Sequence, residues 1–320
     1  MNTVMIVEPE SSNPRSTSEN ESPDIMRMLN YAAGQLTAST VAMYRMSIRD
    51  YIRYAQVHGY SELDHTTLVR WRDEMTFHST KSPNTINREL AAVRRIMVEA
   101  EEYGLITGDE AYKFEKVKGV SMRLLKDRMK HKDSAPILQT RMQQLCNLPD
   151  ESTLLGMRDR ALLNTLVSSG MRASELAGLL VACVFQVDGG YICQIMGKRD
   201  IEYRDVNLSP EAYSYIRTWT LSRGIESPLV FTAFENFGAV PVPTRLSGKA
   251  IWEIVKGYAR QIEGMEHLSP HSFRHHFAQY VIKKADIRTA QISLGHASIA
   301  TTQLYDTHQL TVGVSDHILG

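Results

Sequence analysis

Apolar residues in the first half of the chain recur with the spacing of amphipathic helices. One such helix begins near Thr37, where Ser39 or Thr40 can cap it, and its inward face takes apolar residues at positions 41, 44, 48, 51 and 52. A second helix fits residues 66–77, and a third starts at Ser82-Pro83 and ends before Gly104. The pattern predicts an all-α domain over residues 30–112.

The second half combines helices with a short stretch of strand pattern. A helix over 154–168 is closed by Gly170, and two strands, 191–196 and 201–208, flank a tight turn at 197–200. Further helices start at Ser209-Pro210 and Ser269-Pro270, and Gly295 separates two short ones. Residues 134–320 are therefore predicted to form an α+β domain, mainly α with one small antiparallel β-sheet.

Two segments lie outside these domains. Residues 1–29 start as a polar stretch rich in Ser, Asn, Glu and Pro, which is typical of a flexible tail. The other is the segment 113–133, in which residues 113–132 contain eight Lys or Arg against two acids, a local excess of six positive charges in a chain whose formal net charge is zero. Such a segment can hold a polyanion, or it can be a solvated basic linker, and charge alone leaves both interpretations open.

Membrane and disulfide chemistry find no support in the sequence. No apolar stretch is long enough to span a bilayer and no secretory signal is visible, so we expect a cytoplasmic protein. Cys146, Cys183 and Cys193 are odd in number and form no C-x-x-C pair, which predicts three buried, inert thiols and neither disulfides nor a zinc site.

The second half also contains the parts needed to break a phosphodiester. That reaction requires a nucleophile, cations around the phosphate oxygens and an acid for the leaving oxygen. His271 and Arg274 share the first turn of one predicted helix, an end that favours anions. The candidate residues are Arg172, Lys198, His271, Arg274, His296 and Tyr305.

The order of these residues resembles the tyrosine recombinase and phage integrase family. The matching motifs are the Gly-Met-Arg-Ala-Ser-Glu-Leu segment at 170–176, Gly-Lys at 197–198, His-Ser-Phe-Arg-His-His-Phe-Ala at 271–278, and the Leu-Gly-His to Leu-Tyr segment at 294–305. Each motif is weak alone, whereas the full set in one order is specific. The resemblance extends to 82–95, which is similar to the family's helical core-binding domain.

The resemblance implies a catalytic role for each residue. Tyr305 would attack the phosphate and form a 3′-phosphotyrosyl link, Lys198 would protonate the departing 5′-oxygen, and His271 would assist proton transfer from the tyrosine. The phosphate would be held by Arg172, Arg274 and His296. Glu175 would orient the pocket from behind Arg172. The resemblance implies that the reaction requires no metal, no other cofactor and no ATP.

The resemblance also implies a two-domain DNA clamp, with residues 113–133 as the interdomain linker. Protomers would assemble as a homotetramer on two double-stranded recombination sites, with possible accessory proteins. The basic residues expected to contact DNA are Arg88, Arg94, Arg95, Lys116, Lys118, Arg123 and Lys126. Surface arginines and lysines of a solvated face are the alternative for this set.

Two other functions remain as alternatives. A topoisomerase-like nicking and closing enzyme would use the same covalent chemistry without strand exchange. A DNA-binding regulator is the other, because residues 286–305 can form a helix-turn-helix. For a recombinase, the sequence leaves open integration or excision of a mobile element, inversion, and the resolution of replicon dimers.

Overall fold

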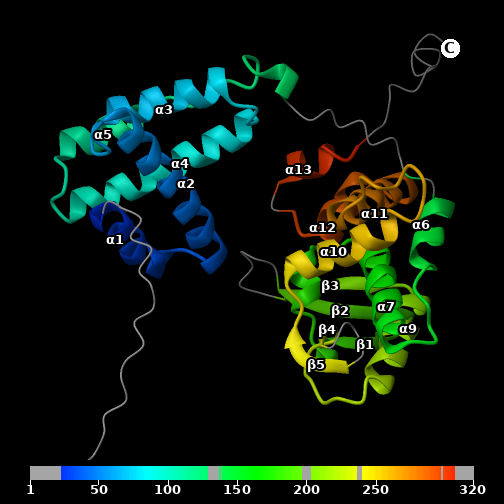
Figure 1. Cartoon of the computed structure of the whole chain (residues 1–320). Coiled ribbons are helices and arrows are strands. Elements are labelled where there is room, and N and C mark those ends of the chain that lie inside the picture. The colour runs from blue at the N-terminus through cyan, green and yellow to red at the C-terminus, as the bar shows by residue number, and fades with distance from the viewer. Residues whose placement is uncertain are drawn as a thin grey trace, which may run out of the picture. The chain divides into compact units, whose positions relative to one another are not determined.

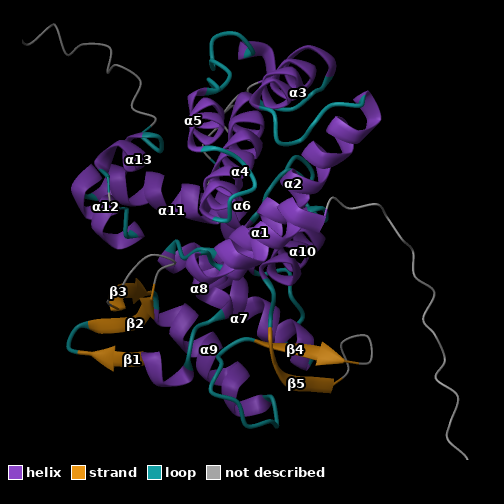
Figure 2. Ribbon diagram, turned by 90° about the vertical axis from the view of Figure 1, so that its left-hand side faces the viewer, coloured by secondary structure: helices purple, strands orange, loops and turns teal. Residues whose placement is uncertain are grey.

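The computed structural model describes residues 23–128, 137, 139–196, 203–235, 240–296 and 298–306. The chain divides into two compact units, residues 1–133 and 134–320 (Figure 1). Helices dominate both units, and every strand in the described part of the chain belongs to the second (Figure 2). The predicted fold class, mainly helical with small antiparallel β-structure after an all-α domain, is confirmed.

The first unit consists of helices with polar caps at their starts. Ser82 accepts a hydrogen bond from the backbone of Thr85, and Pro83 takes the first helical position, as the sequence predicted. The N-cap of the helix that begins at Ala38 is Thr37, and not Ser39 or Thr40 as predicted. The elements are α1 (Pro23–Ala32), η1 (Ala33–Gln35), α2 (Ala38–His58), α3 (His65–His78), α4 (Pro83–Glu102), α5 (Gly108–Lys116) and η2 (Lys126–Arg128).

Helix α4 is the centre of this unit, because α1, α2, α3 and α5 all pack against it. Its Ile86, Leu90 and Ile96 are fully buried. The core extends beyond the predicted domain in both directions. Helix α1 starts inside the predicted tail of 1–29 and buries Leu29. The predicted linker of 113–133 begins within the last turn of α5 and continues into Val117, Val120 and Leu125, which also belong to this core. Their spacing is irregular, so periodicity did not reveal them.

The second unit surrounds α7 with helices and two small sheets. Its helices are α6 (Gln139–Cys146), α7 (Leu154–Ser169), α8 (Ala173–Ala177), η3 (Val181–Cys183), α9 (Pro210–Ser222), α10 (Gly248–Ala259), α11 (Pro270–Lys284), α12 (Ile287–Leu294) and α13 (Ile299–Gln303). Its strands are β1 (Val184–Val187), β2 (Gly190–Met196), β3 (Tyr203–Leu208), β4 (Thr232–Glu235) and β5 (Val240–Arg245).

Strands β1, β2 and β3 form an antiparallel sheet in that order, and Met196 pairs with Tyr203 at the end where β2 is connected to β3. The predicted hairpin is therefore present, and its connecting residues lie outside the described residues. The prediction of one sheet was wrong, because β4 and β5 form a second antiparallel pair. Two prolines in β5, at 241 and 243, weakened its strand signal.

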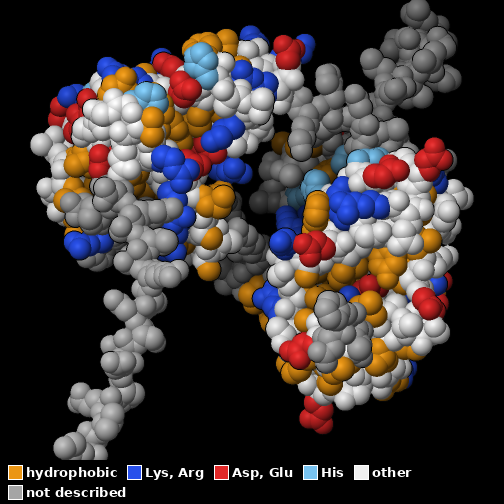
Figure 3. Space-filling view, in the orientation of Figure 1, with side chains coloured by type: hydrophobic (Ala, Val, Ile, Leu, Met, Phe, Trp, Pro, Cys, Tyr) orange, Lys and Arg blue, Asp and Glu red, His pale blue; other side chains and the backbone are white. Residues whose placement is uncertain are grey.

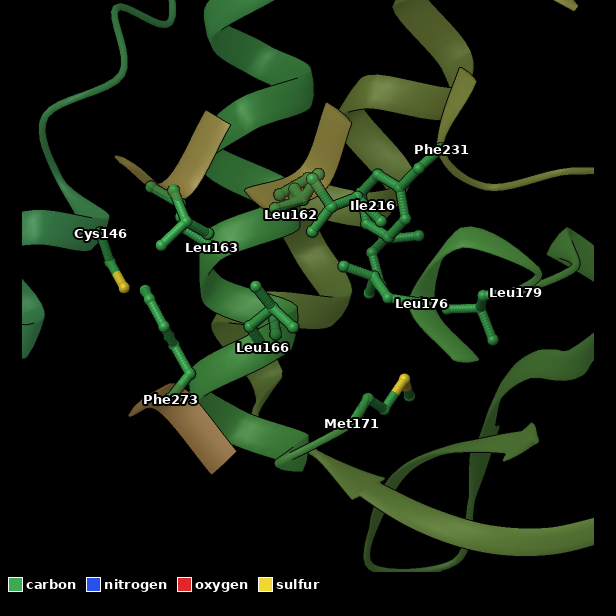
Figure 4. Packing of buried hydrophobic residues seen from close by; sticks show 14 of the residues in the cluster. Cys146, Leu162, Leu163, Leu166, Met171, Leu176, Leu179, Ile216, Phe231 and Phe273 are labelled. Atoms are coloured by element: carbon green, nitrogen blue, oxygen red, sulfur yellow. The ribbon is translucent and has the colours of Figure 1, made fainter. Parts of the chain in front are cut away.

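The main core of the second unit lies between α7 and the elements around it. Leu162 and Leu166 of α7 are fully buried with Phe273 of α11 (Figure 4). Trp219 of α9 is fully buried in the same cluster. Two of the three thiols are buried as predicted, at Cys146 and Cys193, and burial raises their pKa to about 12.

A smaller apolar cluster joins α11, α12 and Tyr305, which lies two residues after α13. Its fully buried members are Ala278, Ala290 and Leu294, and Tyr305 packs with them at 7% exposure. This cluster fixes the end of the described chain against α11. In the part of the chain that the structure describes, no helix is both long and apolar enough to cross a membrane.

Candidate active site

Arg274 is a buried cation held by the ends of two other helices. It is the fifth residue of α11, which starts at Pro270 after the cap Ser269, and it is only 2% exposed. Its Nη1 donates to the carbonyl of Gly170 at 2.8 Å and its Nη2 to the carbonyl of Leu294 at 2.6 Å. Burial first, and then the charge of Arg172, lower the pKa of Arg274 to about 10. The guanidinium therefore remains charged at neutral pH.

His296 connects Arg274 to the last described helix. Its Nε2 lies 2.9 Å from Nη2 of Arg274, and its Nδ1 lies 2.9 Å from Oγ1 of Thr302. Because an arginine only donates, Nε2 must accept, and the ring proton is then on Nδ1, which donates to Thr302. Burial and the nearby Arg274 lower the pKa of His296 to about 4, so the ring is neutral at physiological pH.

Tyr305 lies among three histidine rings. Its ring stacks on His296 with centroids 5.7 Å apart and planes 10° apart. His275 meets it edge-on at 4.8 Å, and His271 lies 6.2 Å away. The tyrosine that the sequence singled out as nucleophile thus shares one site with the predicted histidines, because α13 is tied to His296 through Thr302.

Arg172 and Glu175 form a pair at the start of α8. The backbone N–H of Arg172 donates to Glu175 Oε2 at 2.8 Å, and its Nη1 donates to Oε1 at 2.6 Å. The Glu175 side chain is 2% exposed, whereas that of Arg172 is 39% exposed. Gly170, just before this pair, ends α7 with φ +63°, a left-handed conformation that favours glycine. The sharp turn brings Arg172 to the start of α11.

A pocket of about 260 Å³ lies beside Arg172 and Arg274. Arg172, His271 and Arg274 line it together with Trp252 of α10. Figure 3 shows Lys, Arg and His side chains side by side on the second unit where Figure 1 draws α10 to α12. Two arginines and a histidine around one concavity can bind a phosphate group.

The sequence prediction missed three residues of this site. Arg204 of β3 contacts both carboxylate oxygens of Glu175, at 3.2 to 3.4 Å. Thr302 holds His296, and His275 lies nearest to the Tyr305 ring. A signal existed for the first: Arg204 shares a face of β3 with buried Val206, where an apolar residue would be expected.

The remaining predicted site residues are Lys198 and a set of basic residues that belong to the first unit. Lys198 falls outside the described residues. On the first unit, Arg95 pairs with the buried Glu99 at 2.6 Å, and Arg94 is half-buried with its pKa lowered by burial and by the charge of Arg72. The exposed members of the predicted DNA-binding set are Arg88, Lys116, Lys118, Arg123 and Lys126.

Comparison with known proteins places this geometry in a family. Residues 136–311 match the model of the phage integrase family. The chain is 31% identical over 281 residues to the tyrosine recombinase XerC of Pseudomonas putida, covering 86% of each chain. It is 37% identical over 232 residues to the tyrosine recombinase XerD of Neisseria meningitidis, covering 70% of this chain and 72% of the relative.

Solved structures agree on the fold. The XerH site-specific recombinase bound to its palindromic difH substrate matches with a TM-score of 0.67 at 18% identity, covering 92% of this chain and 93% of that one. A lambda integrase bound to a core site matches with a TM-score of 0.59 at 13% identity, covering 88% of this chain and 76% of that one. This chain belongs to the phage integrase family and is a tyrosine site-specific recombinase.

Proposed function

We propose that this recombinase cleaves DNA through Tyr305 and forms a 3′-phosphotyrosyl intermediate. The phenol oxygen attacks the phosphorus, the bond from phosphorus to the 5′-oxygen breaks, and a free 5′-hydroxyl is left. Rejoining reverses these steps, so no ATP is consumed. One observation carries the proposal: the Tyr305 ring stacks on His296, whose Nε2 is 2.9 Å from the buried Arg274.

Arg172 and Arg274 supply the positive charge for the phosphate. Both line the same pocket, and each brings a guanidinium cation to it. Preformed cations lower the barrier by stabilising the charge that grows on the non-bridging oxygens. A site built only from these side chains needs no metal for this reaction, so we propose cleavage without metal or cofactor.

The proton of Tyr305 goes to His271 or His275. His296 is a poor acceptor, because its Nε2 already accepts from Arg274 and its pKa is lowered to about 4. For the same reason it has no Nε2 proton to offer the phosphate, and we assign it the positioning of Arg274 and Tyr305. His271 lines the phosphate pocket, which favours it, while His275 lies nearer to the phenol ring. Lys198 is proposed, by family resemblance, as the acid that protonates the 5′-oxygen.

Beyond the chemistry, we propose that the two domains clamp duplex DNA and that protomers form a homotetramer on two sites, with accessory proteins in some reactions. The exposed basic residues of the first unit support a phosphate-binding role for Arg88, Lys116, Lys118, Arg123 and Lys126. The relatives named XerC and XerD favour replicon dimer resolution over a mobile element. A transposon integrase also matches, at 16% identity with a TM-score of 0.61, which keeps integration or excision as the second candidate.

The alternatives differ in what they would leave on DNA. A regulator would bind DNA without forming a covalent product. The helix-turn-helix expected for a regulator, residues 286–305, includes α13, and Thr302 of α13 hydrogen-bonds His296 of the candidate active site. A nicking and closing enzyme would relax supercoils without joining two sites. The family assignment favours recombination over both.

The test starts with duplexes selected from a random-sequence library by binding to the full-length protein. These duplexes, nicked near the cleavage position so that religation is prevented, are incubated with the protein in EDTA. We expect a denaturant-resistant adduct at Tyr305 on the 3′ side of the break, and none with Tyr305→Phe, which should bind DNA normally. The absence of an adduct on well-bound DNA would refute the cleavage proposal. Single-turnover pH profiles of His271→Ala and His275→Ala then identify the proton acceptor.

A further inference from the structure

Glu175 is a buried anion with two cationic partners. Its side chain is 2% exposed and receives Arg172 at 2.6 Å on Oε1. Arg204 approaches the same carboxylate from β3, with Nη2 at 3.2 Å from Oε2 and Nη1 at 3.4 Å from Oε1. A single carboxylate is therefore shared between an arginine of the proposed phosphate pocket and one outside it.

This sharing changes the charge that the pocket can present. With Arg172 as its only partner, Glu175 would cancel the positive charge that the phosphate needs, and the effect would be large in a poorly solvated site. The three arginines at 172, 204 and 274 against one glutamate leave two positive charges. A phosphodiester carries one negative charge, and a second develops as the nucleophile adds, so the balance matches the transition state.

We propose that Arg204 is a positioning residue that neutralises Glu175, so that Arg172 keeps its charge for the scissile phosphate while Glu175 still holds its orientation. This inference rests on the proposed cleavage reaction. It assigns to Arg204 a part in catalysis without contact with the substrate.

The surroundings of Arg204 fit this role. Its side chain is 16% exposed and shares a strand face with buried Val206. It packs so closely on the turn before His296 that a Cβ on Gly295 would lie 2.6 Å from its Nε. Gly295 itself has φ +61°, so the turn needs glycine for its backbone and for this contact. Arg204 thus contacts both Glu175, which holds Arg172, and the turn that leads to His296.

The experiment measures the single-turnover rate of adduct formation on the nicked duplexes for wild type, Arg204→Gln, Glu175→Gln and the double variant. Arg204→Gln should slow cleavage by roughly 10- to 100-fold, with DNA affinity nearly unchanged, since one of the two net charges is lost. In the double variant the anion is gone as well, and the net charge returns to two. We expect it to cleave at least ~5-fold faster than Arg204→Gln alone.

Two controls separate charge balance from support of the fold. Arg204→Lys keeps the charge and should retain most of the rate. Arg245→Gln removes an arginine of β5 that bonds the carbonyls of Ala177 and Ser174 on α8 but does not contact Glu175, and it should cleave normally. Thermal melts of every variant accompany the rates.

The outcomes are distinct. If wild type forms no adduct, the proposed cleavage fails and this inference falls with it. If wild type cleaves and the double variant is as slow as Arg204→Gln or slower, charge balance is refuted. If Arg204 only supported the fold, the second substitution would leave the cleavage rate unchanged or lower it further. A lysine variant as slow as the glutamine variant refutes it too.

Discussion

Gly170 offers a test of how tightly the site is built into the fold. It ends α7 at φ +63°, and its carbonyl accepts a hydrogen bond from Arg274. An added Cβ would lie 2.5 Å from Cδ1 of Phe277 and 3.2 Å from Cδ2 of Leu294. Gly170→Ala therefore introduces two separate costs at a point that supports the proposed phosphate pocket.

Each cost has a known size. Holding alanine in the left-handed conformation costs about 1 kcal/mol relative to glycine. Contact at 2.5 Å is more than 1 Å short of normal carbon–carbon separation, and forcing a methyl group into a packed interior costs about 1–3 kcal/mol. We expect Gly170→Ala to lower the free energy of unfolding of the second unit by about 2–4 kcal/mol.

Gly224 supplies the matched control, because it has φ +65° and no atom within 4 Å of an added Cβ. Gly224→Ala should lose only the backbone part, about 1 kcal/mol. Urea unfolding followed by tryptophan fluorescence measures both in a Trp71→Phe background, where Trp219 and Trp252 both report on the second unit. Equal losses in the two variants would refute the packing argument, as would an unchanged stability of Gly170→Ala.

Three further predictions concern the groups around Tyr305. Thr302→Val leaves the buried N–H of His296 without its acceptor, so the free energy of unfolding measured in urea should fall by about 1–3 kcal/mol. In single-turnover assays the rate of adduct formation should fall by a larger factor than the DNA affinity. Because the folded state holds the His296 pKa near 4 while the unfolded ring titrates near its ordinary value, unfolding takes up a proton as pH falls through that interval. Stability should thus drop on going from pH 7.5 to 5, and His296→Asn should lose less over this window; parallel losses would contradict the shift. Trp252 lines the proposed phosphate pocket and is 43% exposed, against 4% for Trp71 and 0% for Trp219, so bound DNA should protect it from acrylamide quenching. Unchanged quenching in a formed complex would argue against phosphate binding in this pocket.

The fold could be predicted where one physical signal dominated. Serine-proline starts at 82, 209 and 269 each began a helix, because serine caps the free N–H groups and proline fits the first turn. The β4–β5 pair was missed, since prolines in β5 deny it a strand pattern. The burial of Val117 and Val120 could not be predicted, because basic residues surround them in the sequence. In the structure, Asn87 hydrogen-bonds both the N–H and the carbonyl of Val120.

Residue types and their order predicted which residues make up the candidate site, but not the contacts that support them. The predicted Arg172, Arg274, His296 and Tyr305 do lie together in the structure. Contacts between distant segments could not be predicted: Arg204 and Glu175 are separated by 29 residues, and they meet only in the folded domain. The protonation state of His296 likewise depends on burial and on Arg274, and neither is visible in a motif.

The hydrogen bonds of Arg274 to two helix-terminal carbonyls have a consequence for how the enzyme divides its free energy. The cost of removing this cation from water is met when the domain folds, because backbone dipoles compensate it there. DNA then encounters a charge already fixed in place, with little side-chain entropy left to lose on association. Pre-organisation of this kind ties activity to fold stability, so changes that loosen the ends of α7 or α12 should lower the cleavage rate well before the protein unfolds.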